Sequence, residues 1–484
     1  MRDYYTLKVN LPAGIVSPGT LQTILSLAYG AKVRQVRFGA RQQLLMTVHY
    51  EEVRFLEKDL KKKQIAYELN TDEYPNIISS YCGEEVFRTG AWLGESEYHT
   101  VLDQFDYQPK LKVNLSDANQ SFTPFFTGNL NFISSPEAHF WHLYIRPRRS
   151  NRLIHWPDLI YTNDIGRLAK AVEHALSFQE SIDEELLYKT VTADQSFITQ
   201  PSTHELELPV FSLPYYEGFN RYGQRSWLGL YRRDEQFSVS FLLDLCALCL
   251  KTRIGELCTT PWKSLIIKGI EEKDRPAWSC ILGKHNINVR HAANELAWQT
   301  EDYAEDGARL KASITRYFEQ NDTRTFGLCF GVQTVPKSEV FGSVLVRKRP
   351  LIRVGKLALF SVYDLYHTEN FNPNSRTYLR VDRGLLKIQL PVQVDRLCRK
   401  FNARRTGETA ETVASIGQEA ESTSSPSLLV YQCPHCLTVY DSRYGDLLRG
   451  IPAGTSFGSL PDSYVCPTCD TPSVDFTQVE VELA

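Results

Sequence analysis

The sequence lacks any apolar run long enough to cross a bilayer. Its longest such run, residues 237–250, is interrupted by Asp244 and is shorter than the roughly 20 residues that a membrane-spanning helix needs. The opening segment MRDYYTLKVNLPAG also has no apolar stretch of the kind that signal peptides carry. These absences predict a cytoplasmic protein with no membrane partner.

An excess of charge of either sign is also missing. The formal net charge of the 484 residues is -3, which gives no general reason to expect nucleic acid or an anionic surface as a partner. Hydrophobic residues make up 42% of the chain and aromatic residues 12%, which is typical of globular proteins. A chain of this length should form roughly two or three domains with sizeable cores.

Common catalytic signatures are absent too. The chain contains no G-x-G-x-x-G fingerprint, no Walker loop and no HExxH motif. Each of these motifs places particular groups against a phosphate or a zinc ion, so none of those chemistries is supported. No catalytic residue is assigned from the sequence.

Two Cys-x-x-Cys pairs near the C-terminus are the strongest positive signal. Cys433 and Cys436 lie in CPHC, and Cys466 and Cys469 lie in CPTC. One such knuckle lets two thiolates converge, and a second knuckle completes four soft ligands of the kind that select zinc or iron. The spacing therefore predicts a tetrahedral metal site made by these four cysteines.

The segment between the knuckles distinguishes the two metals. It contains YD after the first knuckle, then GIPAGTSF, LPD before the second knuckle and DF at the end, and this pattern resembles a rubredoxin. The resemblance implies one iron ion that cycles between Fe²⁺ and Fe³⁺ and carries one electron, in a domain of residues 428–484. Leu437 and Asp470 stand where rubredoxins usually have glycine, so the redox potential cannot be carried over. A zinc ribbon shares the knuckles, and the alternative is a zinc-binding interaction protein.

A segment poor in large apolar side chains precedes this domain. Residues 404–427 are rich in Ser, Thr, Glu, Ala and Gly, so they cannot bury enough surface to fold alone. We expect a flexible linker that keeps the small domain at high local concentration near whatever the first part of the chain forms or binds.

The first four hundred residues contain a weak internal repeat. Residues 21–46 align with residues 242–267 without a gap. Each copy has the apolar pattern of a helix followed by the pattern of a strand. The repeat predicts two related halves, residues 1–200 and 205–403. It also places Cys246 and Cys249 on the buried face of a helix, which favours core packing over a second metal site.

Three segments of these halves resemble siroheme sulfite and nitrite reductases. They are GARQQLLM at 39–46, PKLKVNL at 109–115 and TTPWKSLIIKGI at 259–270, and the likeness covers roughly residues 1–350. It implies an α+β fold with two ferredoxin-like half repeats of the hemoprotein type. The small rubredoxin domain would follow them.

The resemblance also implies tetrapyrrole carboxylate contacts at Arg41, Lys110 and Lys112. Residues two apart on a strand point to one face, and a polycarboxylate ligand needs converging cations. A solvated basic strand face is the alternative. A second basic run could be a patch that docks an acidic partner or simply exposed charge, and its members are Arg146, Arg148, Arg149 and Arg152.

Departures from the family concern the cluster ligands. The family holds a four-iron cluster through C-x5-C and C-x3-C, but here the first pair falls near Asn294 and Thr300, and Cys329 stands alone near the second. Trp262 occupies the position that matches Arg41 in the second half. The sequence therefore argues against a four-iron cluster and against the family's six-electron reduction.

We expect one-electron transfer through a mononuclear Fe(Cys)4 site, with a degenerate reductase-like region that docks to a redox partner protein. The partner would be a nitrite or sulfite reductase, or a reductase that supplies electrons. The alternative is a siroheme- or tetrapyrrole-binding oxidoreductase of the nitrite or sulfite reductase type, fed by its own rubredoxin.

Overall fold

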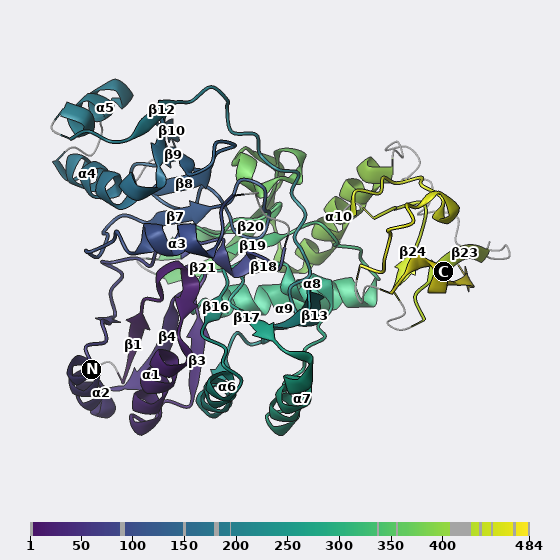
Figure 1. The fold of residues 1–484 in the computed structure, drawn as a ribbon, viewed down its shortest axis with the longest axis horizontal. Coiled ribbons are helices and arrows are strands. Elements are labelled where there is room, and N and C mark those ends of the chain that lie inside the picture. The colour runs from purple at the N-terminus through teal and green to yellow at the C-terminus, as the bar shows by residue number, and fades with distance from the viewer. Residues whose placement is uncertain are drawn as a thin grey trace. The chain divides into compact units, whose positions relative to one another are not determined.

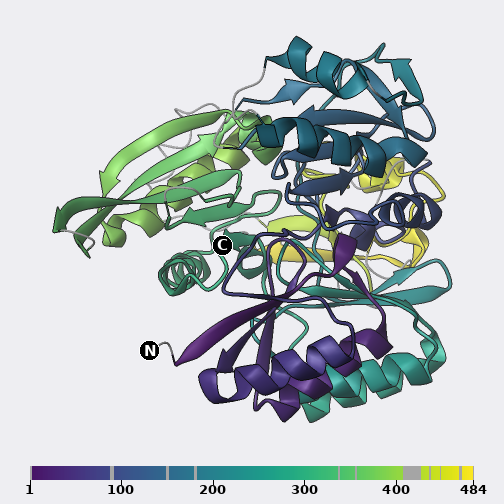
Figure 2. The same ribbon diagram turned by 90° about the vertical axis from the view of Figure 1, so that its left-hand side faces the viewer.

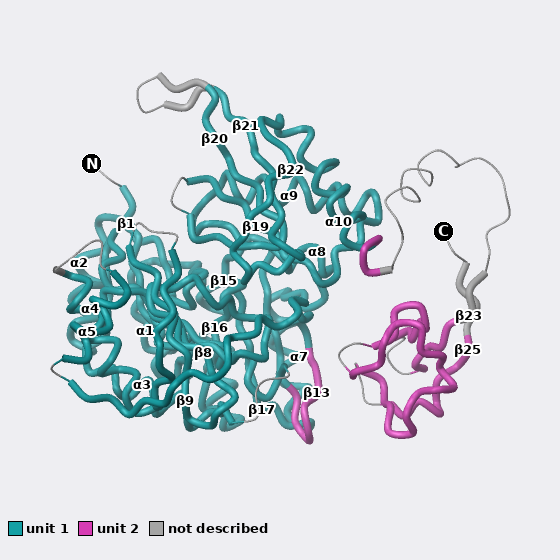
Figure 3. Tube along the Cα trace, turned by 90° about the horizontal axis from the view of Figure 1, so that it is seen from above, with its two compact units in different colours: residues 1–218, 227–402 teal, residues 219–226, 403–484 magenta. Residues whose placement is uncertain are grey.

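The computed structural model describes residues 3–87, 92–148, 152–178, 183–193, 195–335, 338–354, 357–406, 427–434, 438–446, 449–467 and 471–482. The chain forms two compact units, one of residues 1–218 and 227–402 and one of residues 219–226 and 403–484 (Figure 3). Within the described residues, no helix combines the length and apolarity that a bilayer crossing requires.

The larger unit repeats one order of elements. The first half contains β1 (Tyr4–Val9), β2 (Ile15–Val16), α1 (Pro18–Gly30), β3 (Gln35–Phe38), β4 (Leu44–His49) and α2 (Tyr50–Lys62). The second half contains β14 (Arg225–Leu230), β15 (Phe237–Ser238), α6 (Val239–Lys251), β16 (Leu257–Thr259), β17 (Leu265–Ile270) and α7 (Arg275–Lys284). The repeat expected from the sequence is confirmed, because α1 falls on α6 and β4 falls on β17.

Each half contributes one short strand to the sheet of the other half. One sheet has the order β15-β3-β4-β1-β5, with β5 at Glu68–Leu69, and the other contains β14-β17-β16-β2. Phe237 of β15 pairs with Val36, and Val16 of β2 pairs with Leu257. The helices that follow these strands, α1 and α6, lie side by side in two views (Figures 1 and 2). Each half therefore completes the other half's sheet.

Helices α1 and α6 form for the same local reasons. Ser17 and Ser238 are the N-caps, and their hydroxyl oxygens accept from the backbone N–H of Thr20 at 3.1 Å and of Phe241 at 3.4 Å. The buried face of α6 includes Cys246 and Cys249, both fully buried. These two cysteines therefore belong to the core, as the repeat predicts.

A second pair of sheets repeats another topology. The first contains β6 (Ile78–Ser79), β7 (Val113–Ser116), β8 (Leu130–Ser134), β9 (Phe140–Ile145), β10 (Ile154–His155), β11 (Asp158–Tyr161) and β12 (Thr199–Pro201). The second contains β18 (Trp298–Thr300), β19 (Phe330–Gln333), β20 (Val344–Val354), β21 (Leu357–Thr368) and β22 (Tyr378–Leu385). In both sheets three neighbouring strands run parallel and the next is antiparallel. The expected α+β architecture of two half repeats is thus confirmed.

Further helices of the chain are α3 (Glu95–Leu102), α4 (Ile165–Phe178), α5 (Glu184–Ala193), α8 (Ala293–Leu296), α9 (Glu305–Gln320) and α10 (Leu390–Thr406). The smaller unit contains a sheet of order β24-β23-β25, from Val439–Tyr440, Ser427–Gln432 and Thr477–Glu482. Most of the expected linker, residues 407–426, lies outside the described residues, as do Cys436, Cys469, Leu437, Asp470 and Arg149.

Candidate metal centre and basic cavity

The two knuckles of the smaller unit are each closed by the same kind of backbone hydrogen bond. Cys433 directly follows β23, and its N–H donates to the carbonyl oxygen of Thr438 at 2.8 Å. Cys466 lies next to the Val465–Pro472 bridge, and its N–H donates to the carbonyl oxygen of Thr471, also at 2.8 Å. Each hydrogen bond joins residues five positions apart, so the described ends of the two knuckles are held in the same way. The other predicted ligand of each knuckle lies outside the described residues.

Both described thiols are fully buried in one small core. Cys433 and Cys466 pack with Tyr440, Tyr464 and Phe476 in a single cluster. Sulfur is the soft donor that iron and zinc prefer. Buried thiolates need a compensating positive charge, which a metal ion supplies. The described donors therefore fit a tetrathiolate metal site.

Aromatic rings surround this core and their hydroxyl groups are satisfied. Tyr431 stacks on Phe457 with ring centroids 3.8 Å apart. The Tyr440 hydroxyl donates to the carbonyl oxygen of Thr455 at 2.8 Å, and the Tyr464 hydroxyl donates to Asp446 at 3.1 Å. Burial raises the pKa of Tyr440 and of Tyr464, so both phenols are neutral at physiological pH.

The larger unit contains a basic cavity of about 1090 Å³. Residues from both halves line it, and its volume is at the upper end of the range of small-molecule pockets. Its cations are Lys110, Lys112, Arg146, Arg148, Arg347 and Arg376, its carboxylates are Asp72, Glu73 and Glu339, and its aromatic rings are Phe126, Phe341 and Tyr378. Cations and ring faces together suit a flat polyanionic molecule.

Two of the three expected tetrapyrrole contacts line this cavity. The Lys112 ammonium lies 2.6 Å from the Glu339 carboxylate, and the more exposed Lys110 lies 3.2 Å from Glu73. Arg146 and Arg148 of the second basic run join them, whereas Arg152 pairs with Glu184. The two basic segments therefore converge on one cavity.

Arg41 has a different environment and is not among the described residues that line the cavity. Its guanidinium donates to the carbonyl oxygens of Asn76 at 2.7 Å and Val113 at 3.2 Å. Burial lowers the pKa of Arg41 to about 10, and the nearby Glu339 carboxylate opposes that shift. Arg41 thus joins the segment preceding β6 to β7, next to Lys112.

Cys329 occupies the repeat position of Lys112. The Lys112 N–H donates to the side-chain oxygen of Asn129 at 3.0 Å, and the Cys329 N–H donates to the hydroxyl oxygen of Ser343 at 3.2 Å. Cys329 is fully buried, and burial raises the pKa of its thiol to about 12. The thiol is therefore protonated at neutral pH.

Trp262, which matches Arg41 in the repeat, is part of an aromatic cluster. Its side chain is 2% exposed, and its indole N–H donates to the carbonyl oxygen of Phe122 at 2.8 Å. Its ring packs against Tyr216 and against Phe341 of the cavity wall. Apolar packing therefore replaces a cation at this position.

Sequence reasoning missed five charged residues of the cavity, of which Asp72 and Glu73 come from the first half. Arg347, Arg376 and Glu339 come from the second half, where no resemblance to a binding segment was noticed. The dense basic run VRKRP that contains Arg347 was a usable signal. The position of Arg347 in a cavity that residues of the first half also line depends on long-range packing.

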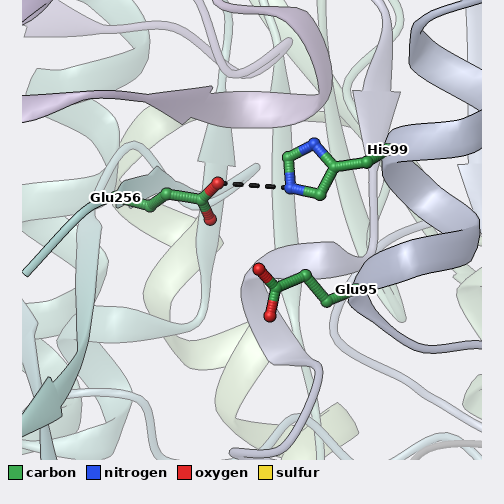
Figure 4. Close-up of side chains that lie close together, drawn as sticks. All are labelled: Glu95, His99 and Glu256. Atoms are coloured by element: carbon green, nitrogen blue, oxygen red, sulfur yellow. Dashed lines mark ion pairs between the residues drawn. The ribbon is translucent and has the colours of Figure 1, made fainter.

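A separate group of Glu95, His99 and Glu256 lies at one end of α3 (Figure 4). One ligand atom from each residue lies within 4.8 Å of the others. The His99 ring and Glu256 form a pair at 3.2 Å, and the Tyr81 hydroxyl donates to Glu256 at 2.7 Å. These mutual contacts account for His99 and Glu256, so we assign the group no function.

Comparison with known proteins identifies the smaller unit. The rubredoxin family model matches residues 430–476. Rubredoxin-2 of Chlorobaculum tepidum is 45% identical over 49 residues, which are 10% of this chain and 94% of that protein. Rubredoxin-2 of Pseudomonas aeruginosa is 39% identical over 51 residues, or 10% and 93% of the two chains. Through its C-terminal domain, this chain belongs to the rubredoxin family.

Most of the chain is similar in fold to a second protein. The NirA protein of Mycobacterium tuberculosis aligns with a TM-score of 0.62 and 14% identity, covering 86% of this chain and 84% of that protein. At this identity the likeness establishes the fold alone. The reductase-like architecture expected from the sequence is confirmed as a NirA-like fold.

Proposed function

We propose that the protein transfers single electrons through one iron ion held by Cys433, Cys436, Cys466 and Cys469. The NirA-like region would serve as a module that docks to a redox partner protein. The observation that carries the proposal is that the described thiols of both knuckles are buried in one core, each beside the same kind of backbone hydrogen bond. When bound there, iron supplies a one-electron couple between Fe²⁺ and Fe³⁺.

The chain's own residues set the conditions for that couple. The aromatic cluster around Cys433 and Cys466 excludes water from the sulfur atoms. Exclusion of water and backbone N–H groups near sulfur are the main protein influences on such a potential. Tyr440 and Tyr464 stay protonated because burial raises their pKa values, so neither phenol would exchange a proton with the couple near neutral pH.

The docking role rests on the residues that stand where siroheme sulfite and nitrite reductases have the cysteine ligands of their four-iron cluster. Asn294 and Thr300 carry no thiol, and the buried Cys329 thiol is protonated at neutral pH because its pKa is raised. A NirA-like fold without those thiolates can present a surface without performing the family's multi-electron chemistry. The proposed partner is a nitrite or sulfite reductase or a reductase that supplies electrons.

A second candidate function is favoured by the basic cavity. Its six cations would hold the carboxylates of a siroheme-like tetrapyrrole, and Phe126 and Phe341 would contact its ring. Such a group, when bound, would supply redox chemistry of the nitrite or sulfite reductase type. The rubredoxin domain would then deliver electrons within the same chain.

An absorption spectrum with metal analysis distinguishes these functions. Ferric tetrathiolate bands that bleach on reduction, with one iron and no tetrapyrrole, are expected for the carrier. Tetrapyrrole bands would support the second candidate, and a colourless zinc protein would contradict both. Cys433→Ser should abolish the iron bands, whereas Cys280→Ser, at an exposed cysteine of the larger unit, should leave them intact.

A further inference from the structure

One carboxylate in the cavity wall forms ion pairs with two cations. Glu339 places one carboxylate oxygen 2.6 Å from the Lys112 ammonium and the other 3.4 Å from the Arg146 guanidinium. The side chains of Lys112 and Arg146 are only 24% and 16% exposed, and that of Glu339 is 36% exposed. Partly buried pairs of this kind are screened less by solvent than surface pairs.

Glu73, the other cavity carboxylate that pairs with a lysine, forms a longer and more exposed ion pair. Glu73 lies 3.2 Å from Lys110, and the two side chains are 58% and 53% exposed. An ion pair this exposed contributes little, because water and salt screen it. Glu73 is therefore a matched reference for Glu339, since both line the same cavity and both pair with a lysine of the segment just before β7.

Glu339 also interacts electrostatically with Arg41, the third residue predicted to contact tetrapyrrole carboxylates. Among charged neighbours, its carboxylate is the largest influence opposing the fall of the Arg41 pKa that burial causes. One side chain thus compensates Lys112 and Arg146 by contact and Arg41 through space. A carboxylate of a bound ligand would need the same cations.

We propose that Glu339 is an internal competitor that ligand carboxylates must displace from Lys112 and Arg146. This inference rests on the second candidate function, in which the cavity binds a polycarboxylate tetrapyrrole. Glu339 then sets specificity: a ligand with few carboxylates cannot displace it, whereas one with many can compensate all the cations. The residue lowers the affinity of the cavity below what its cations alone would allow.

The test is a fluorescence titration of the full-length protein with uroporphyrin, a metal-free tetrapyrrole that carries eight carboxylates. Glu339→Gln keeps the shape of the side chain and removes its charge, so binding should become roughly tenfold tighter. Glu73→Gln makes the same change of net charge at the exposed pair and should alter the Kd by less than about twofold.

A double-mutant cycle separates the effect of the Glu339–Lys112 contact from the effect of net charge on binding. If Glu339 competes through Lys112, the gain from Glu339→Gln should shrink in a Lys112→Gln background, because one contested cation has been removed. Thermal unfolding of each variant checks that it is folded, and Glu339→Ala provides a second variant if Glu339→Gln is not.

The outcomes distinguish the inference from the function on which it rests. Binding by wild type with no gain in Glu339→Gln would overturn the competitor role and leave the cavity function standing. An equal gain in Glu73→Gln would also overturn it, since net charge alone would then explain the effect. Absence of binding by wild type and by both folded Glu339 variants would overturn the cavity function together with the inference.

Discussion

His142 is a buried histidine whose environment disfavours its charged form. Its side chain is 2% exposed, and its Nδ1 atom has no hydrogen-bond partner among the described residues. Burial lowers the pKa of His142 to about 4, and the nearby His155 imidazole acts in the same direction.

This shift predicts a loss of stability in mild acid. Between pH 6.5 and pH 4 the unfolded chain binds a proton at His142 and the folded chain does not, so the free energy of unfolding falls as the pH falls. The full loss should be about 3 kcal/mol. Urea unfolding of wild type and of His142→Gln at pH 7 and pH 4.5 measures it. Equal pH dependence in the two proteins would contradict the assignment.

Trp262 makes a second prediction at the scale of one residue. Its indole is buried against Tyr216 and Phe341 and donates to the carbonyl oxygen of Phe122. Trp262→Ala should lower the free energy of unfolding by about 3–5 kcal/mol because it leaves a cavity. Trp262→Phe keeps most of the packing and should cost about 1–2 kcal/mol for the lost hydrogen bond.

Chemical denaturation of the larger unit, followed by circular dichroism, measures both changes. A loss below about 1 kcal/mol for Trp262→Ala would mean that the aromatic cluster does not support the cavity wall as described.

At the scale of elements, α1 and α6 are repeat copies that differ in the quality of their N-caps. The cap hydrogen bond is 3.1 Å at Ser17 and 3.4 Å at Ser238. Ser17→Ala should therefore lower the free energy of unfolding by about 1 kcal/mol, and Ser238→Ala by less.

Urea unfolding of the two variants provides the comparison. Ser26→Ala, at an exposed interior position of α1, is the control and should be neutral or slightly stabilising. A larger loss for Ser238→Ala than for Ser17→Ala would show that the cap distances do not determine these contributions.

At the scale of the whole molecule, the two compact units should respond differently to metal removal. The core of the smaller unit is a short cluster that includes Cys433 and Cys466, and metal binding to such a domain contributes directly to its folding free energy. The larger unit has its own extensive core, from Leu7 in β1 to Cys398 in α10.

Scanning calorimetry with and without bound metal tests this difference. Removing the metal, or replacing Cys466 with Ser, should lower or abolish the unfolding transition of the smaller unit and leave that of the larger unit within about 2 °C. A common fall of both transitions would show that the units unfold as one.

Features that depend on neighbouring residues could be predicted from the sequence. Cys433 and Cys466 could be identified because a knuckle is a local turn. Helices α1 and α6 could be predicted because helical periodicity and an N-cap serine are recognisable within a short stretch of sequence. Lys110 and Lys112 were identified through the resemblance of PKLKVNL to a reductase segment, but both lie just before β7 and not within a strand as expected.

Features that depend on contacts between distant segments became visible only in the folded chain. Glu339 meets Lys112 and Arg146, and β2 and β15 exchange places between the halves, through contacts between residues far apart in the chain. No local pattern encodes such contacts, because they arise from the packing of whole sheets. The same packing directed Arg41 toward backbone carbonyl groups and brought together the cations that line the cavity.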